Sequence, residues 1–521
     1  MNENSAMFVV LLLCGAGFYG LTLQFGSKER VISILFGQFL VYFLVKQVWR
    51  LLKASALAYN HDLRKIPGPW LSRFTNVPLK LRALSGKRNS YVDRLHRQYG
   101  PFVRVAPSEV SVSDINAYRE IHKVGTTFSK APWYQKLSPK QYNDDTCAVF
   151  GIRDHRKAAT RRKLFLQAGA PASVREWEPG VVEIVGETVT KIERDLKRRG
   201  KADVMRWWSF MTADVLGLIA FGEHFGMVKT EQKSQLVKDV ETSIILVGLK
   251  LEIPWIWNII NLVPIPAFRR FVGLFDRFEA YADTAIANTR VAAKGQTKTM
   301  FSKMAATDTQ QLPEHVIRQE AVNIIIAGTD TTAMTLTYLV YAVLADETGK
   351  IRQPLLTELD AASDHAPWYE LEQLPYLNCV VDETLRLYSP IGGSLPRVPP
   401  AGGATLGQYH IPADTIVMTQ SSSFHTDPNV FKDPYVFNPR RWESPTAEMK
   451  EYFMPFGGSA RSCLGMNIAR LEILHAVALL FKRCPNIRLA PSMEEDSMKP
   501  LEFFVSSPRG GKCEIVLGNH A

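Results

Sequence analysis

Cys463 is the residue whose type and setting most directly indicate chemistry. It lies in the stretch Phe-Gly-Gly-Ser-Ala-Arg-Ser-Cys-Leu-Gly, residues 456–465, and a periodic apolar segment follows over 466–481. This order predicts a cysteine at a helix N-terminus, where unpaired N–H groups, the helix dipole and nearby Arg461 favour a thiolate. The glycines allow backbone to approach a large flat group. One cysteine cannot form a four-cysteine metal site, so it is either an axial ligand to haem iron or a nucleophile.

A second candidate lies within a long helical pattern over residues 314–344. The sequence Ala-Gly-Thr-Asp-Thr-Thr occupies positions 327–332, near the middle of that pattern. A glycine inside a helix costs about 1 kcal/mol relative to alanine, and the carboxylate of Asp330, close to three isoleucines, is costly if it is buried. Local violations of this kind are expected at functional sites.

The hydroxyl of Thr331 can donate to the carbonyl of Ala327, four residues earlier, and such a bond tends to bend or open a helix. A groove lined by Ala327 and Gly328 could then accept a small ligand. The alternative is an ordinary core helix whose threonine and aspartate side chains are satisfied by their neighbours.

Glu383 and Arg386 lie three residues apart on a predicted helix, residues 378–387, so both are on one face. An exposed pair of this type contributes little to stability. After Pro390 the pattern changes to short strands and turns, at residues 394–397, 404–406, 409–412 and 415–419. A proline-rich stretch then leads into the Cys463 loop, and so much irregular chain around one cysteine indicates a cofactor cradle.

The elements that must position these residues are mostly helical. Apolar residues at helical spacing over 89–99, 176–199 and 204–221 predict three further helices, while alternation over 102–105 and 109–112 predicts a short hairpin. The sequence therefore predicts a mainly α fold with a smaller β region, of the α+β class.

Composition limits the possible functions. The chain has 521 residues, 46% of them hydrophobic, which favours one large globular domain with an appendage. Its six cysteines are widely spaced and are expected to be reduced thiols. The net charge of +11 comes without basic runs interleaved with aromatic residues, so we expect no nucleic-acid binding. An anionic membrane surface or an acidic protein partner suits this charge better.

The first 60 residues predict a membrane anchor of one or two helices. Residues 7–25 are an uncharged run of 19 residues, about 28 Å long as a helix, which is close to the hydrocarbon thickness of a bilayer. A second run, 31–45, is a short span or an interfacial helix, and the basic residues after it place that side in the cytosol. A cleaved signal peptide is the alternative, but no positive charge precedes the first run.

Two further stretches bear on the membrane. Ile-Pro-Gly-Pro at residues 66–69 predicts a stiff, non-helical hinge, because each proline fixes its φ and bars the preceding residue from a helix. Residues 244–275 are unusually apolar for a connecting region. They are either buried core or a membrane-dipping segment that lines a route for a lipophilic substrate.

Four motifs, in order, resemble the cytochrome P450 superfamily of haem-thiolate monooxygenases. They are Ala-Gly-x-Asp-Thr-Thr, Glu-x-x-Arg, Phe-x-Pro-x-Arg-Trp at 437–442 and Phe-x-x-x-x-Arg-x-Cys-x-Gly at 456–465, all within 140 residues. The apolar N-terminus and the Pro-Gly-Pro hinge look like membrane-bound eukaryotic members. Residues 394–412 and 154–162 look most like fungal enzymes of secondary metabolism.

This resemblance implies the cytochrome P450 fold. It divides the chain into a membrane anchor at 1–60, a hinge at 61–70 and a haem-thiolate catalytic domain at 71–521. Cys463 would be the proximal thiolate ligand of the haem iron. Arg461, Arg397 and Arg162 would pair with the haem propionates, because a planar guanidinium meets a carboxylate bidentately. The other expected cofactor contacts are Phe456, which would pack against the porphyrin, Gly465, Ala327 and Gly328.

The resemblance also assigns roles away from the thiolate. Thr331 and Asp330 would deliver protons during cleavage of O2. Glu383, Arg386 and Arg441 would form a buried ionic triad that supports folding and haem retention, and removal of one member would cost several kcal/mol.

Two residues depart from the family pattern. Ser459 stands where the family usually has glycine, so the loop needs a serine that can adopt an unusual φ. Arg440 stands where a glutamate is frequent, immediately before Arg441. Neither position is expected to touch the sulfur or the proton-delivery pair.

The implied function is insertion of one oxygen atom of O2 into a lipophilic small molecule by an enzyme of the endoplasmic reticulum membrane, with haem b as cofactor and the catalytic domain facing the cytosol. The chain has no dinucleotide or flavin fingerprint, so electrons from NADPH would come through NADPH–cytochrome P450 reductase, with cytochrome b5 as an optional second partner. The alternatives are a haem-thiolate isomerase or dehydratase, which would need no proton relay, and a non-catalytic haem-binding protein.

Five largely apolar segments are expected to line the substrate pocket, and they are residues 125–150, 244–268, 321–326, 391–395 and 501–506. Such a lining suits a terpenoid, polyketide or alkaloid intermediate and excludes a charged sugar or nucleotide. A fungal secondary-metabolite pathway is the expected context.

Overall fold

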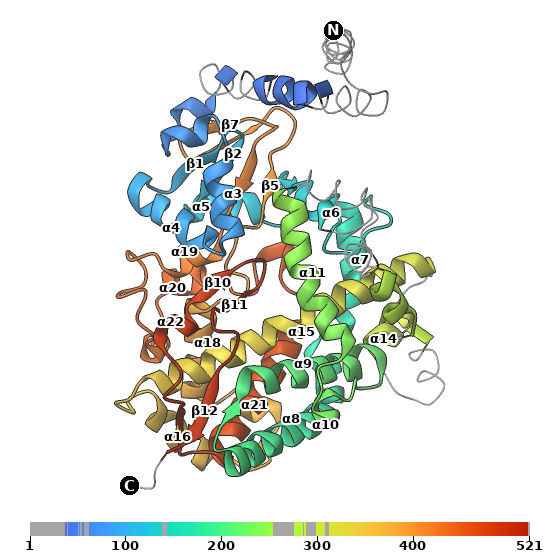
Figure 1. Cartoon of the computed structure of the whole chain (residues 1–521), viewed down its shortest axis with the longest axis vertical. Coiled ribbons are helices and arrows are strands. Elements are labelled where there is room, and N and C mark those ends of the chain that lie inside the picture. The colour runs from blue at the N-terminus through green and yellow to red at the C-terminus, as the bar shows by residue number, and fades with distance from the viewer. Residues whose placement is uncertain are drawn as a thin grey trace, which may run out of the picture.

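The computed structural model shows a helical body with a smaller sheet region at one end (Figure 1). It describes residues 37–49 without 39, residues 52, 55–56, 62–137, 143–253, 273, 276–284, 286–287, 299–307 and 312–518. The family-level fold predicted from the sequence, mainly α with a smaller β region, is confirmed.

Four long helices form the core of the body. They are α8 (Pro171–Arg199), α9 (Val204–Phe221), α15 (Glu314–Ala345) and α21 (Met466–Arg483). Helix α15 packs against α9 and α21, and α8 also packs against both of these helices. A helix surrounded in this way must be apolar on most of its faces, which is why α15 and α9 read as nearly continuous hydrophobic segments.

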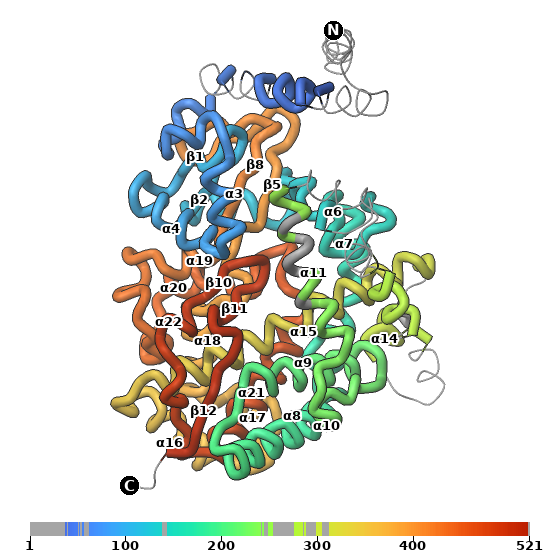
Figure 2. Tube along the Cα trace, in the orientation of Figure 1, coloured from blue at the N-terminus to red at the C-terminus, as the bar shows by residue number. Residues whose placement is uncertain are grey.

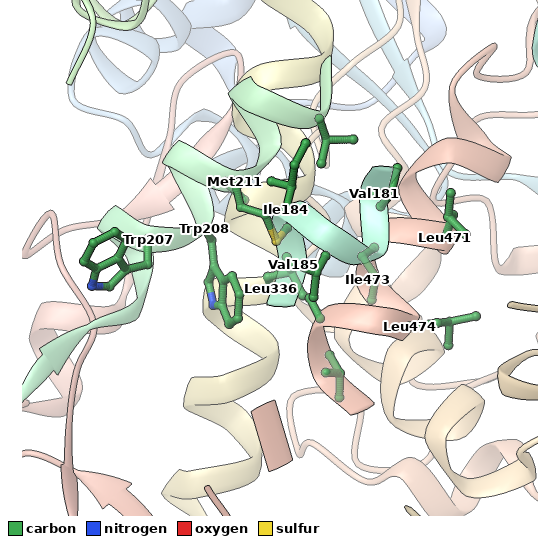
Figure 3. Close-up of a cluster of buried hydrophobic side chains, with 14 of the residues drawn as sticks. Val181, Ile184, Val185, Trp207, Trp208, Met211, Leu336, Leu471, Ile473 and Leu474 are labelled. Carbon is green, nitrogen blue, oxygen red and sulfur yellow. The ribbon is translucent and has the colours of Figure 1, made fainter. Parts of the chain in front are cut away.

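The side chains between these helices are tightly interdigitated. Figure 3 shows Trp208 and Met211 of α9 beside Val185 of α8, with Leu336 of α15 and Ile473 of α21 in the same cluster. All five are buried. This packing fixes the relative positions of α15 and α21, the two helices that carry the chemical motifs.

The sheet region joins chain segments that are far apart in sequence. Strands β1 (Phe102–Ala106) and β2 (Glu109–Val112) form the predicted hairpin, and β2 pairs in parallel with β8 (Ile416–Met418). Strand β8 then pairs with β5 (Arg397–Val398), which pairs with β3 (Ser129–Lys130). Figure 2 shows the blue β1 and β2 beside the orange β8.

The remaining described elements are shorter or lie around this frame. The helices are η1 (Asp62–Lys65), η2 (Trp70–Arg73), α3 (Val77–Leu84), α4 (Arg88–Tyr99), α5 (Ile115–His122), α6 (Trp133–Lys136), α7 (His155–Ala168), α10 (Met227–Thr230), α11 (Gln235–Glu252), α14 (Met300–Thr307), α16 (Arg352–Ala361), α17 (Trp368–Leu371), α18 (Pro375–Leu387), α19 (Ser421–His425), η3 (Pro439–Trp442), α20 (Ala447–Tyr452), η4 (Ser459–Arg461) and α22 (Glu495–Met498). The strands are β4 (Ala202–Asp203), β6 (Ala404–Leu406), β7 (Tyr409–Ile411), β9 (Ile487–Leu489), β10 (Pro500–Glu502), β11 (Ser506–Pro508) and β12 (Glu514–Leu517).

Most predicted elements are present, and the differences have local causes. Helices α8 and α18 begin earlier than predicted, at Pro171 and Pro375, because proline fits the first helical turn, where its missing N–H is not needed. The strand predicted at 394–397 is wrong in extent, since only Arg397 and Val398 form a strand. Pro396 has no N–H to donate to a ladder, which restricts pairing at that position.

The predicted hinge is non-helical and is fixed to the sheet. The carbonyl of Pro67 accepts a 2.8 Å hydrogen bond from the N–H of Arg104 in β1. A Cβ on Gly68 would lie only 2.4 Å from the Arg104 carbonyl oxygen, so glycine is required for this close approach. Residues 66–69 are therefore held against strand β1 of the body.

The apolar run predicted at 7–25 lies outside the described residues, as does much of the second run. Within the described residues, Leu40–Trp49 is a short apolar helix, drawn in dark blue apart from the body in Figure 1. Among the described residues as a whole, only α9 is long and apolar enough to cross a bilayer, and 78% of it is buried, which identifies it as a core helix.

Candidate active site

The Cys463 loop is a tight backbone structure that precedes α21. The N–H of Cys463 donates to the carbonyl of Phe456 at 2.8 Å, which closes the loop. Gly457 has a φ of 67°, a left-handed conformation that suits glycine. Helix α21 begins at Met466, so the prediction that Cys463 stands just before a helix is confirmed.

The Cys463 side chain has exposed surface, and that surface faces an internal cavity. Burial among protein atoms raises the pKa of its thiol, while the N–H of Gly465 and the guanidinium of Arg162 act in the opposite direction. Burial therefore outweighs the helix N-terminus on which the sequence prediction of a thiolate relied. A metal cation at the sulfur would reverse this balance, because coordination deprotonates a thiol.

The cavity has a volume of about 940 Å³, and its walls are largely apolar. All five segments predicted to line a pocket contribute to it, although residues 138–142 and 254–268 of two of those segments lie outside the described part. Cys463, Phe456 and Gly465 reach the same cavity as Ala327 and Gly328. One chamber thus contains both motifs that the sequence singled out.

Helix α15 runs without interruption through the glycine. The hydroxyl of Thr331 donates to the carbonyl of Ala327 at 3.0 Å, as predicted, and the helix remains α-helical through Ala345. Thr331 lines the cavity, whereas Asp330 is buried in the helix packing and is not among the cavity-lining residues. A Cβ on Gly328 would lie 3.0 Å from a methyl of Leu216 in α9, so glycine allows this close packing.

Three predicted arginines converge on the cavity. Arg162 donates to the carbonyl of Ser462 at 2.8 Å, and Arg397 donates to the hydroxyl of Tyr134 at 2.8 Å. Arg461 donates to the carbonyl of Ile152, but its Nη2 is buried without a partner. Burial, followed by repulsion from the other two arginines, lowers the pKa of Arg461 to about 10.

Lys130 is a fourth cation that lines the cavity beside these arginines, and sequence reasoning did not identify it. Its Nζ donates to the carbonyl of Phe150 at 2.5 Å and lies 4.8 Å from the ring centre of Tyr134. Burial and the three arginines lower the pKa of Lys130 well below its ordinary value. Its only sequence signal was its place in a predicted lining segment.

None of these four cations forms an ion pair within the described residues. Buried cations are normally paired, since an uncompensated buried charge is costly. The cluster, composed of Lys130, Arg162, Arg397 and Arg461, therefore fits a ligand that carries more than one negative charge. We call this group the cavity cation cluster.

Glu383, Arg386 and Arg441 are brought together as predicted. Arg386 donates to both carboxylate oxygens of Glu383 at 2.8 Å, and Arg441 donates to one of them at 3.0 Å. The indole of Trp442 and the N–H of Asn438 donate to the same carboxylate, at 2.9 and 2.8 Å. Glu383 and Arg386 are fully buried, in agreement with the buried triad that the family resemblance implied, so the small contribution of an exposed pair does not apply here.

His425 connects this network to the cysteine loop and was not identified from the sequence. Its Nδ1 donates to the carbonyl of Arg386 at 3.1 Å, and its Nε2 accepts the N–H of Met454 at 3.0 Å. This bonding requires a neutral ring, and burial together with nearby Arg386 lowers the pKa of His425 to about 3. Met454 lies two residues before Phe456, the first residue of the cysteine loop.

Comparison with known proteins decides the family. The family model described as Cytochrome P450 matches residues 66–514. The chain belongs to the cytochrome P450 family. Cytochrome P450 monooxygenase tazI of Aspergillus terreus is 36% identical over 505 residues, which cover 95% of this chain and 99% of that protein.

Two further relatives support the same assignment. Cytochrome P450 monooxygenase stcB of Emericella nidulans is 35% identical over 476 residues, covering 89% of this chain and 90% of that protein. Cytochrome P450 monooxygenase orf2 of Aspergillus niger is 33% identical over 463 residues, covering 88% and 93%. This cytochrome P450 is accordingly an oxidoreductase of the monooxygenase type.

Membership of this family implies haem b as cofactor, and the cavity fits that group. The sulfur of Cys463 opens on the cavity, and the unpaired cavity cation cluster offers sites for two propionates. Tight turns at Gly457 and Ser459 keep the loop backbone compact beside the sulfur. A haem would supply a ligand for the sulfur and negative charge for the cluster.

The two departures from the family pattern are accommodated locally. Ser459 adopts a φ of 58°, the unusual conformation expected at a position where the family has glycine. Arg440 is exposed, lies 3.1 Å from Glu443 and stands over the ring of Tyr376. Neither residue lines the cavity.

Proposed function

We propose that this cytochrome P450 inserts one oxygen atom of O2 into a lipophilic terpenoid, polyketide or alkaloid intermediate of a fungal secondary-metabolite pathway. The observation that carries the proposal is the single apolar cavity that contains both the Cys463 sulfur and the Thr331 helix face. The fungal origin of the similar proteins named above supports the context.

Cys463 is the proposed proximal ligand of the haem iron, and the cavity cation cluster is proposed to bind the propionates. Phe456 and Gly465, which flank the sulfur along the chain, complete the proximal wall. Bound in this position, the haem supplies the activation of O2. The largely apolar walls exclude water from the reacting centre and bind the hydrocarbon skeleton.

Thr331 is the proposed proton-delivering residue on the cavity wall. Its hydroxyl donates to the carbonyl of Ala327 and retains lone pairs that can accept a hydrogen bond from water in the cavity. Asp330 immediately precedes Thr331 and is buried outside the cavity lining. We propose that it supplies protons to Thr331 from the interior of the protein.

Electrons are proposed to come from NADPH through NADPH–cytochrome P450 reductase, with cytochrome b5 as an optional second donor. The net charge of +11 suits an acidic donor surface. We further propose an anchor at 1–60, a hinge at 61–70 and a catalytic domain at 71–521. The anchor would hold the enzyme in the endoplasmic reticulum membrane with the catalytic domain in the cytosol.

The direct test is oxygen-isotope labelling. The full-length protein, in membranes with the reductase and NADPH, is supplied with ¹⁸O2 and the lipophilic metabolites that accumulate when this protein is deleted. One labelled atom is expected in the product. Conversion without label and without NADPH would instead support the isomerase or dehydratase alternative. NADPH consumption that no metabolite stimulates would support a non-catalytic haem-binding protein.

A further inference from the structure

One face of α15 carries a regular row of residues along the cavity. Gln319, Asn323, Ala327 and Thr331 are spaced four apart, and all four line the cavity. Residues four apart lie nearly above one another on a helix, about 6 Å apart along its axis. The row therefore leads from the Thr331 hydroxyl to two carboxamides, of which Asn323 is about 12 Å away along the axis.

The two carboxamides are half-buried, and within the described part of the chain neither forms a hydrogen bond. Asn378 shows the contrast, since both ends of its carboxamide are bonded. It donates to three backbone carbonyls and accepts a hydrogen bond from Arg470. Carboxamides at the edge of an apolar chamber are favourable only if something there bonds to them.

Glu320, the charged residue between Gln319 and Asn323, is not a hydrogen-bond partner for these carboxamides. Glu320 points away from the cavity, where it is fully buried and bonded to Arg161 at 2.7 Å and to the N–H of Val149. Val322, Ile324 and Ile326, the cavity-lining residues closest to Asn323 along the helix, are apolar. Gln319 and Asn323 thus form a neutral polar patch on an apolar section of the wall, and a neutral carboxamide can both donate and accept.

We propose that Asn323, assisted by Gln319, binds a neutral oxygen group of the substrate, a carbonyl or a hydroxyl, and so sets which carbon faces the reacting centre. This inference rests on the proposed function and narrows its substrate class. The substrate is a lipophilic skeleton that already carries an oxygen roughly 12 Å, or two helical turns, from the carbon to be oxidised. An earlier oxygenating or carbonyl-forming reaction must supply it.

The test compares binding of ketones with binding of their parent hydrocarbons. Equilibrium dialysis of the holoenzyme, without NADPH, gives the Kd for 9-fluorenone and fluorene, and for 1-tetralone and tetralin. The Kd ratio within a pair cancels most of the shared apolar contribution. Replacing Asn323→Leu is expected to shift the ratio against the ketone by about five- to tenfold, the range of one lost hydrogen bond.

Matched variants separate hydrogen bonding from shape. Val322→Leu alters an adjacent lining residue and is expected to leave the ratio unchanged within about twofold, since it removes no donor. Asn323→Ser keeps a donor and should retain part of the ketone preference, while Gln319→Leu should shift the ratio less than Asn323→Leu.

An unchanged ratio in the Gln319→Leu/Asn323→Leu double variant, for every pair, overturns the proposal. Equal affinity of wild-type protein and the double variant for every ketone tested would also overturn the proposal. Because no turnover is measured, a clear ketone preference in a protein that fails the ¹⁸O test would refute the proposed monooxygenation of a metabolite and leave this binding site intact.

Discussion

The Glu383 network and the cavity face of α15 both place polar side chains in largely apolar surroundings, but they differ in how those groups are satisfied. The Glu383 carboxylate accepts hydrogen bonds from two arginines, an indole and a backbone N–H, and Arg386 also donates to three carbonyls. On the cavity face of α15, Gln319 and Asn323 have no such partners in the described part of the chain.

The difference separates scaffolding from recognition. A buried network in which every charge is bonded holds one geometry, and removal of one member strands the others. Polar groups that face a cavity without partners contribute little to the fold and are available to a ligand. Changes in the first region should therefore alter stability, and changes in the second should alter chemistry or binding.

The largest expected effect comes from Glu383→Gln. This change keeps the shape but leaves Arg386 and Arg441 without a counter-charge in a buried site, so the free energy of unfolding should fall by about 3–5 kcal/mol. Urea unfolding measures it. Glu443→Gln is the control, because Glu443 pairs with Arg440 at the exposed surface, and it should change stability by less than about 0.5 kcal/mol. Equal effects would contradict the proposed scaffold.

His425→Leu should cost about 2 kcal/mol, because it leaves the carbonyl of Arg386 and the N–H of Met454 unpaired. The cost should also depend on pH. The pKa of His425 is about 3 in the folded protein and about 6.5 when unfolded, so the folded state binds fewer protons between these values.

The contribution of neutral His425 is consequently complete above pH 6.5 and is lost as pH falls, by about 1.4 kcal/mol per pH unit. Unfolding free energies of wild type and His425→Leu, measured from pH 7.5 to 5, should converge toward low pH. Parallel curves would show that His425 is not held neutral by the fold.

Thr331→Ala tests the cavity face. Among the described residues its hydroxyl donates only to Ala327 of its own helix, so stability should change by less than about 1 kcal/mol, and haem content should be retained. Product formed per NADPH should fall about tenfold, with the reducing equivalents appearing as peroxide. This decrease is smaller than the decrease in rate expected when a general acid is removed entirely, because water in the cavity can still supply protons. Unchanged coupling would exclude the proton role of Thr331.

The smallest expected effect is at Ser459, which adopts a φ of 58°. Ser459→Gly should stabilise the protein by about 0.5–1 kcal/mol, because glycine accepts this conformation without a Cβ penalty. Ala460→Gly, the next position in the same turn, serves as control and should be neutral or destabilising. A destabilised Ser459→Gly would mean that the serine side chain has a role of its own.

Sequence reasoning anticipated the parts of the site that depend on local pattern. The helix that carries Thr331, its bond to Ala327 and the place of Cys463 before α21 all follow from spacing of a few residues. The family resemblance further predicted that Glu383, Arg386 and Arg441 lie together, although Glu383 and Arg441 are 58 residues apart along the chain.

The residues that sequence reasoning missed act through long-range contacts. Lys130 joins the cavity cation cluster only because β3 pairs with β5, which carries Arg397. His425 matters because it bridges Arg386 and Met454, and no periodicity marks such a bridge. Asp330 shows the converse, since its position beside Thr331 suggested a cavity residue, whereas the helix turns its side chain into the packing.

The most direct test of the central claim is the absorption spectrum of the reduced, carbon monoxide-bound protein, recorded for wild type and Cys463→Ala. If the Cys463 sulfur ligates the iron in the cavity, wild type will show the strongly red-shifted Soret band of thiolate ligation, and the variant will lack it. A histidine-type spectrum in wild type, or an unchanged band in Cys463→Ala, would contradict the assignment.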